Sequence, residues 1–78
     1  MSDRIKLIWD FRGMAAKGTA LHHRIHLEEF AIKEGIRNHK TGVENINDMY
    51  SIAYICVEED QMPIVRDALR PHRGEVDE

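Results

Sequence analysis

One segment, residues 14–35 (MAAKGTALHHRIHLEEFAIKEG), constrains the fold more than any other, because it is the longest run with helical periodicity. The stripe that should face a core contains Ala16, Ala20, His23, Leu27, Phe30 and Ala31. Leu21, Ile25 and Ile32 gather on nearly the opposite side. Large aliphatic residues on an outer helix face indicate a partner surface, although scattered exposed aliphatic residues are also common on monomers.

The sequence predicts the end of this helix but allows two positions for its start. It starts either near Met14 or at Thr19, which would serve as the N-cap with Gly18 just before it. Gly35, which follows Lys33 and Glu34, is a good C-terminal signal because glycine adopts the left-handed conformation there.

Two segments have the patterns of strands. Residues 4–12 (RIKLIWDFR) alternate, which predicts a strand with one apolar face and one mixed face. Residues 49–59 (MYSIAYICVEE) are apolar on both faces, as in a strand that is covered on both sides.

The remaining segments are shorter. Residues 36–46 form a polar edge strand, in which Gly42 indicates a bulge or bend, and Asn47-Asp48 is the expected hairpin turn. A second helix follows, with Asp60 as N-cap, Pro63 in its first turn and Pro71 at its end. Its buried stripe is Met62, Val65 and Leu69, with Ala68 beside them. The tail, residues 72–78, is long enough only for a brief edge strand.

The order β-α-β-β-α(-β) predicts a single α+β domain, residues 1–78, of the ferredoxin-like kind. In this plan two helices cover one face of an antiparallel sheet and leave the other face open. Both faces of residues 49–59 are apolar, so we expect the open face to meet that of a second copy in a homodimer. The motifs WDFRG, HHRIHLEEF and ALRPHRG resemble small uncharacterised bacterial proteins with such a fold, and the resemblance brings no activity with it.

Composition narrows the setting. The only cysteine, Cys56, excludes a disulfide within one chain and lies in an apolar run, which favours a reduced, buried thiol and a cytoplasmic protein. The net charge of −3, without a lysine or arginine block, argues against nucleic acid as a partner. No apolar run approaches the roughly 20 residues that a membrane span requires.

The histidines are the first group of candidate site residues. His22 and His26 are four residues apart, which is the helical spacing that pairs two imidazoles on a divalent metal ion. A complete site needs further ligands, for which Glu29, His39 and His72 are possible sources. The alternative is a pair of surface histidines beside Glu29 and Lys33.

His23 lies on the buried stripe between Ala20 and Leu27. A neutral core histidine that bonds a tyrosine or a backbone carbonyl explains this position. A functional imidazole at a pocket is the other interpretation.

The topology predicts a second group. Asp10, Arg12, Arg70, His72 and Arg73 should converge on the end of the domain where the first helix begins. Backbone N–H groups and arginine side chains would favour a small anion there. The alternative is internal pairing, with Asp10, Asp48 and the acidic tail neutralising the arginines.

The sequence therefore supports two functional hypotheses. The first is a small homodimeric module that binds a small anionic ligand and has no resident cofactor. The second is a metal-dependent or histidine-assisted enzyme that uses His22, His23 and His26. Cys56 is not expected to act as a nucleophile, because no positive neighbour would lower the pKa of its thiol.

Overall fold

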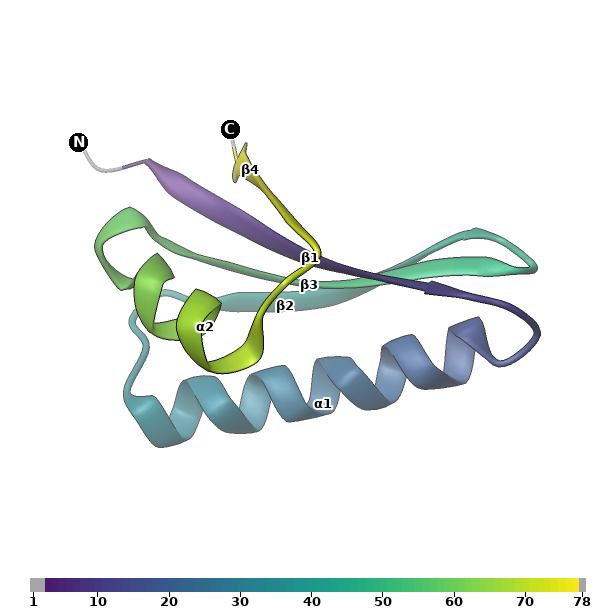
Figure 1. Ribbon diagram of the computed structural model, residues 1–78. Helices are drawn as coiled ribbons and strands as arrows, with labels where there is room; N and C mark the ends of the chain where they lie inside the picture. The colour runs from purple at the N-terminus through teal and green to yellow at the C-terminus, as the bar shows by residue number, and fades with distance from the viewer. Residues whose placement is uncertain (1–2, 78) are drawn as a thin grey trace.

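A central strand, β1 (Arg4–Arg12), organises the sheet of this chain, whose residues 3–77 are described by a computed structural model (Figure 1). It pairs with β3 (Tyr50–Glu58) on one side and with β4 (Arg73–Asp77) on the other. The hairpin partner of β3 is β2 (Lys40–Asn47), so the sheet has the order β2-β3-β1-β4. All pairs are antiparallel, and β1 and β2 therefore run in the same direction with β3 between them.

Both helices lie on one side of this sheet (Figure 1). The long helix α1 (Ala16–Glu34) begins at Ala16, without a side-chain cap, so the start near Met14 is confirmed and Thr19 is not the N-cap. Its end was predicted correctly, because Gly35 adopts the left-handed conformation with φ of 67° and donates its N–H to the carbonyl groups of Ala31 and Ile32.

The core forms where the buried stripe of α1 meets the apolar face of β1 and β3. The predicted stripe is confirmed for the four residues that become fully buried, and Phe30 packs against the same cluster. The buried cluster consists of Leu7, Trp9, Ala20, Leu27, Ala31, Ile36, Ala53, Ile55, Val57 and Val65. The helix is about as long as β1, since 19 residues of helix rise about 28 Å and nine residues of strand about 30 Å.

The second helix is short and begins differently from the prediction. A 3₁₀ turn (η1, Glu59–Gln61) precedes α2 (Met62–Leu69), so Asp60 is not its N-cap. Gln61 is buried and accepts a hydrogen bond from the backbone N–H of Arg37, which holds the turn against the end of α1. Eight helical residues rise only about 12 Å, so the chain leaves α2 halfway along β1 and starts β4 at Arg73, opposite Ile8.

The β2–β3 hairpin also departs in detail from the prediction. Its turn is Asp48-Met49, one residue later than expected, because the side chain of Asn47 accepts a hydrogen bond from the Met49 N–H. The register shift lies between Asn45 and Asn47 and not at Gly42. Residues 36–39 are not in a strand, although β2 is an edge strand as predicted.

The sheet face that carries no helix is less apolar at its surface than the sequence indicated. Its central residues Ile8, Ile52 and Cys56 are at most 3% exposed within one chain. Since no helix lies there, neighbouring side chains of the same face must cover them. Two cations lie over tyrosine rings on this face: Lys6 over Tyr54 and Arg12 over Tyr50.

Within residues 3–77, no helix is both long enough and apolar enough to cross a lipid bilayer.

Candidate functional site

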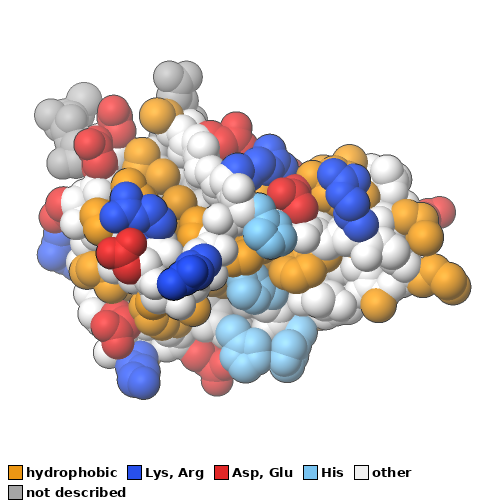
Figure 2. Space-filling view, viewed as in Figure 1, with side chains coloured by type: hydrophobic (Ala, Val, Ile, Leu, Met, Phe, Trp, Pro, Cys, Tyr) orange, Lys and Arg blue, Asp and Glu red, His pale blue; other side chains and the backbone are white. Residues whose placement is uncertain are grey.

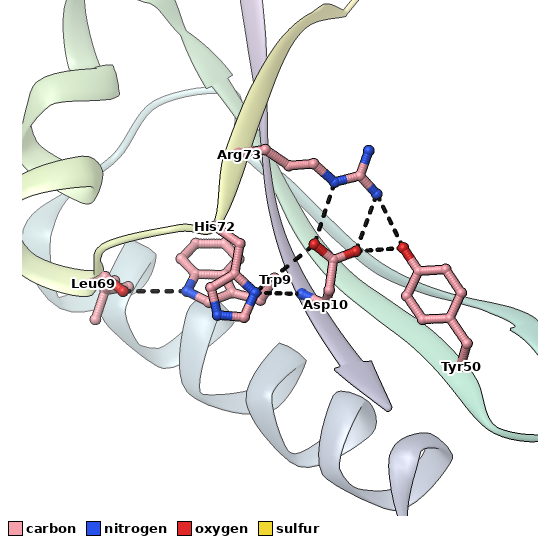
Figure 3. A network of polar contacts seen from close by, with 6 residues as sticks. All are labelled: Trp9, Asp10, Tyr50, Leu69, His72 and Arg73. Atoms are coloured by element: carbon pink, nitrogen blue, oxygen red, sulfur yellow. Dashed lines mark hydrogen bonds and ion pairs between the residues drawn. The ribbon is translucent and has the colours of Figure 1, made fainter. Parts of the chain in front are cut away.

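The Asp10 carboxylate is the centre of a polar network on the open face of the sheet (Figure 3). One oxygen accepts hydrogen bonds from the Tyr50 hydroxyl at 2.5 Å and from Nη2 of Arg73 at 3.1 Å, and Nε of Arg73 lies 3.3 Å from the other. The hydrogen bond from Tyr50 is the main cause that lowers the pKa of Asp10, and Arg73 contributes to the same effect. Asp10 is therefore ionised and occupies the donors that an anionic ligand would need on Arg73.

Tyr50 is the member of this network that sequence reasoning missed. The register places it opposite Arg12, two pairs along from Asp10 and Ile52 and on the same sheet face, so that its hydroxyl reaches the carboxylate of Asp10. That hydrogen bond raises the pKa of the Tyr50 hydroxyl. The guanidinium of Arg12 lies 4.1 Å from the centre of the Tyr50 ring, so Arg12 joins the network only by stacking.

His72 has a structural role at the edge of β1. The ring nitrogen Nδ1 of His72 accepts a hydrogen bond of 2.8 Å from the backbone N–H of Asp10. The backbone N–H of His72 donates to the carbonyl of Ile8 at 2.9 Å. The imidazole thus replaces the missing continuation of β4 as a partner for β1. Because Nδ1 acts as the acceptor, the proton of the neutral ring is on Nε2.

Arg70 does not join the other predicted anion-site residues. It lies at the C-cap of α2 in the left-handed conformation, with φ of 48°. The structure thus brings together Asp10, His72 and Arg73, with Arg12 beside them, and it leaves Arg70 near Arg66. The shortness of α2 is the reason, because Arg70 lies well short of the end of the domain where α1 begins.

An apolar groove of about 370 Å³ lies between α2 and β4 on the helix side of the sheet. It is lined by Ile5, Leu7, Met62, Arg66, Pro71, Arg73, Gly74, Glu75 and Val76. A second hollow is formed by Arg66, Asp67, Arg70 and Pro71, and the two hollows share Arg66 and Pro71. Figure 2 shows apolar surface bordered by lysine and arginine side chains on this part of the molecule.

His22 and His26 meet on the exposed flank of α1. Their Nε2 atoms are 2.9 Å apart and their rings are nearly perpendicular, at 85°. Nδ1 of His26 lies 3.3 Å from the Glu29 carboxylate. Histidine side chains are prominent on the face shown in Figure 2. Among the side chains described, those of residues 3–76, no three of His, Cys, Asp or Glu are grouped closely enough to hold a metal ion by themselves.

His23 is packed between aromatic rings. Its ring centre is 4.8 Å from that of Trp9 and 5.5 Å from that of Phe11. Burial is the main cause that lowers the pKa of His23, so the ring is neutral near pH 7. The expected bond to a tyrosine or a carbonyl is not formed at Nε2, which is buried and has no hydrogen-bond partner in the part of the chain described with side chains, residues 3–76.

Comparison with known proteins gives no relative from which a role could be transferred. No protein-family model matches the sequence. No curated protein and no solved structure matches it significantly.

Proposed function

We propose that this chain is a small binding module for an organic anion with an apolar body. The apolar body lies in the groove between α2 and β4, and the anionic group is bound by Arg66 and Arg70. The observation that carries this proposal is the guanidinium of Arg70, which makes no hydrogen bond or ion pair with any of the side chains described in residues 3–76 and lies beside the groove.

The charges and dimensions support this location. Arg66 pairs with Asp67 at 3.0 Å, but both side chains are more than half exposed, and such pairs contribute little. The volume of about 370 Å³ is within the usual range of small-molecule sites, about 300–1,000 Å³. The predicted location around Arg12, His72 and Arg73 is less favourable, because Asp10 already neutralises Arg73 there.

The dipole of α2 opposes an anion at this position, and its cost can be compared with the attraction of the two arginines. The C-terminal end of α2 carries a partial negative charge, which works against an anion by about 1 kcal/mol or less. An exposed ion pair contributes about 0.2–1 kcal/mol, so two arginines together offset the helix dipole, and the apolar body supplies the rest of the binding free energy.

Isothermal titration with octanoate and phenyl phosphate tests the proposal. Acetate and inorganic phosphate carry the charge without the apolar body, so we expect them to bind at least about tenfold more weakly, since burying two methylene groups contributes about 1.6 kcal/mol. We expect Arg70→Ala to weaken binding of the larger anions about two- to fivefold, because one exposed ion pair is lost.

Arg12→Ala is the matched control, because it removes an arginine that stacks on Tyr50 away from the groove. Binding should be unchanged in this variant. Equal loss in Arg12→Ala and Arg70→Ala, or the absence of binding at millimolar ligand, would contradict the proposed location.

We also propose a fold type and an assembly for this chain. We infer a ferredoxin-like fold, supported by the parallel β1 and β2 on either side of β3 and by β4 beside β1. We infer a homodimer, supported by the exposure of Leu21, Ile25 and Ile32 on the outer face of α1. The buried position of Cys56 suits a cytoplasmic protein.

A further inference from the structure

The His22–His26 pair is held together by a hydrogen bond between its two rings. Both Nε2 atoms point at each other across 2.9 Å, and the ring centres are 4.5 Å apart. The spacing of four residues on α1 places the two side chains on the same flank of the helix. Two ring nitrogens therefore converge on one point in solvent.

This separation matches what a metal ion requires of two neighbouring ligands. Imidazole nitrogens bind divalent transition metals at about 2.0–2.1 Å. Two such nitrogens at adjacent positions, separated by 90° at the metal, are therefore about 2.9 Å apart. The two Nε2 atoms are 2.9 Å apart in the structure. A metal ion can therefore bind both from one side of the line that joins them, and each ring then turns by about 45° to direct its lone pair at the ion.

We propose that His22 and His26 bind a divalent transition-metal ion through their Nε2 atoms, on the flank of α1 and separate from the groove beside α2. Glu29 is a positioning residue, since its carboxylate lies 3.3 Å from Nδ1 of His26. A proton on that Nδ1 leaves the lone pair of His26 Nε2 available for the metal, which is the usual relation between a metal-binding histidine and its carboxylate partner.

The proton balance of binding is simple. In the metal-free pair one Nε2 donates to the other, and the His26 tautomer described above makes His22 the donor. On binding, the proton of His22 moves through solvent from Nε2 to Nδ1, the hydrogen bond between the rings is lost, and two metal–nitrogen bonds form. Neither ring changes its charge, and no electron is transferred.

The donors select the class of metal. Imidazole suits zinc, nickel and copper, whereas magnesium and calcium prefer oxygen ligands. Adjacent nitrogens at 90° fit the tetragonal geometry of copper(II) or nickel(II), and copper(II) has the highest affinity of the series. Because residues 3–76 offer no third ligand of the usual kinds at this position, water or an external donor fills the other coordination positions.

Titration of the full chain, purified without an affinity tag, with copper(II) tests the inference. We expect one ion per chain, with nitrogen hyperfine splitting in the electron paramagnetic resonance spectrum. His22→Ala and His26→Ala should each lower the affinity at least about tenfold, and Glu29→Gln about tenfold, as is usual for the loss of a carboxylate partner. All three positions are exposed on α1 and alanine favours helices, so the variants should fold.

Two controls separate this site from unspecific binding by histidines. His72→Ala removes a histidine outside α1 and should leave the affinity unchanged. His26→Ala combined with Lys33→His keeps five histidines but moves one to a position 11 residues from His22, about 16 Å along the helix, and should bind as weakly as His26→Ala alone. Unchanged copper binding by the doubly substituted chain, equal loss in His72→Ala, or binding of magnesium with similar affinity would overturn the inference.

Discussion

At the scale of single residues, the ion pair between His39 and Glu28 ties the segment just before β2 to α1. His39 hydrogen-bonds the Glu28 carboxylate through Nε2 and the Ile36 carbonyl through Nδ1, and the hydroxyl of Thr41 donates to the other oxygen of Glu28. The contact with Glu28 is the main cause that raises the pKa of His39, and the same contact lowers the pKa of Glu28.

These directions predict how the pair affects stability with pH. The raised pKa of His39 contributes stability that is complete below about pH 6.5 and is lost as the pH rises through the folded-state value. The lowered pKa of Glu28 contributes stability above about pH 4.3 that is lost on acidification through its folded-state value. We expect His39→Gln to lower the free energy of unfolding most between these limits, by about 1 kcal/mol or less because the pair is partly exposed.

Urea denaturation between pH 5 and pH 9 measures this dependence, with Thr41→Val as the control. That variant removes the other hydrogen bond to Glu28 without removing a group that titrates near neutrality, so its effect should be constant from about pH 6 to pH 9. A destabilisation by His39→Gln that is as large at pH 9 as at pH 5.5 would rule out the ion pair as its cause.

At the scale of elements, two glycines show how the same substitution acts in opposite directions. Gly18 is exposed in the first turn of α1 with open space around its Cα, so Gly18→Ala should raise the free energy of unfolding by about 0.5–1 kcal/mol. A Cβ at Gly42 of β2 would overlap the phenol ring of Tyr54, which also carries Lys6 over its face. Gly42→Ala should therefore cost about 1–3 kcal/mol.

Guanidinium denaturation of the two variants beside the original chain checks both signs in one experiment. A methyl group at position 42 would displace the Tyr54 ring and would also disturb the contact of that ring with Lys6. The single variant Lys6→Ala measures the second effect alone, since it removes the cation from the Tyr54 ring without moving the ring. A neutral Gly42→Ala variant would mean that the Tyr54 ring swings away at no cost, and would contradict the close packing of β2 against β3.

The elements show where sequence reasoning succeeds. The limits of β1 were predicted correctly, because its strict alternation ends at Gly13, and the buried stripe of α1 follows from its periodicity. The start of α2 and the hairpin turn were missed by one or two residues. Local hydrogen bonds decide these positions: the Asn47 side chain at the turn and the buried Gln61 before α2.

The candidate site was predictable only where it depends on the order of the strands. The return of β4 next to β1 brings His72 and Arg73 close to Asp10, just beyond the last residue pair of the two strands, Ile8 and Arg73. The place of Tyr50 depends on the register of β1 and β3, and the separation of Arg70 depends on the length of α2. Neither quantity can be obtained from residue types at a given spacing.

At the scale of the whole molecule, the structure favours the outer face of α1, and not the open face of the sheet, as the surface for a second copy. The open sheet face was expected to need a partner, but its central apolar residues are already buried in one chain and charged side chains lie around them. Among the large aliphatic residues that remain exposed, three lie together on the outer face of α1: Leu21, Ile25 and Ile32, at 50%, 44% and 70%. A dimer would therefore form through α1.

Sedimentation velocity at micromolar concentration tests this assembly. We expect a particle of twice the 9.1 kDa chain mass, and its conversion to a single chain by Ile25→Glu together with Ile32→Glu. The matched control is Tyr54→Glu on the sheet face, which should not change the mass. If the protein without substitutions sediments as a single chain, the dimer is contradicted. If Tyr54→Glu alone dissociates the dimer, its interface lies on the open face of the sheet and not on α1.

The indole of Trp9 offers an optical reporter that requires no label. It is the only tryptophan of the chain, it is almost fully buried against His23, and its N–H donates to the carbonyl of Leu69 at the last turn of α2. Its emission should move to longer wavelength whenever that turn lifts from the sheet and admits water. One fluorescence signal can therefore follow both the unfolding of each variant and the arrival of an anion at the arginines of α2.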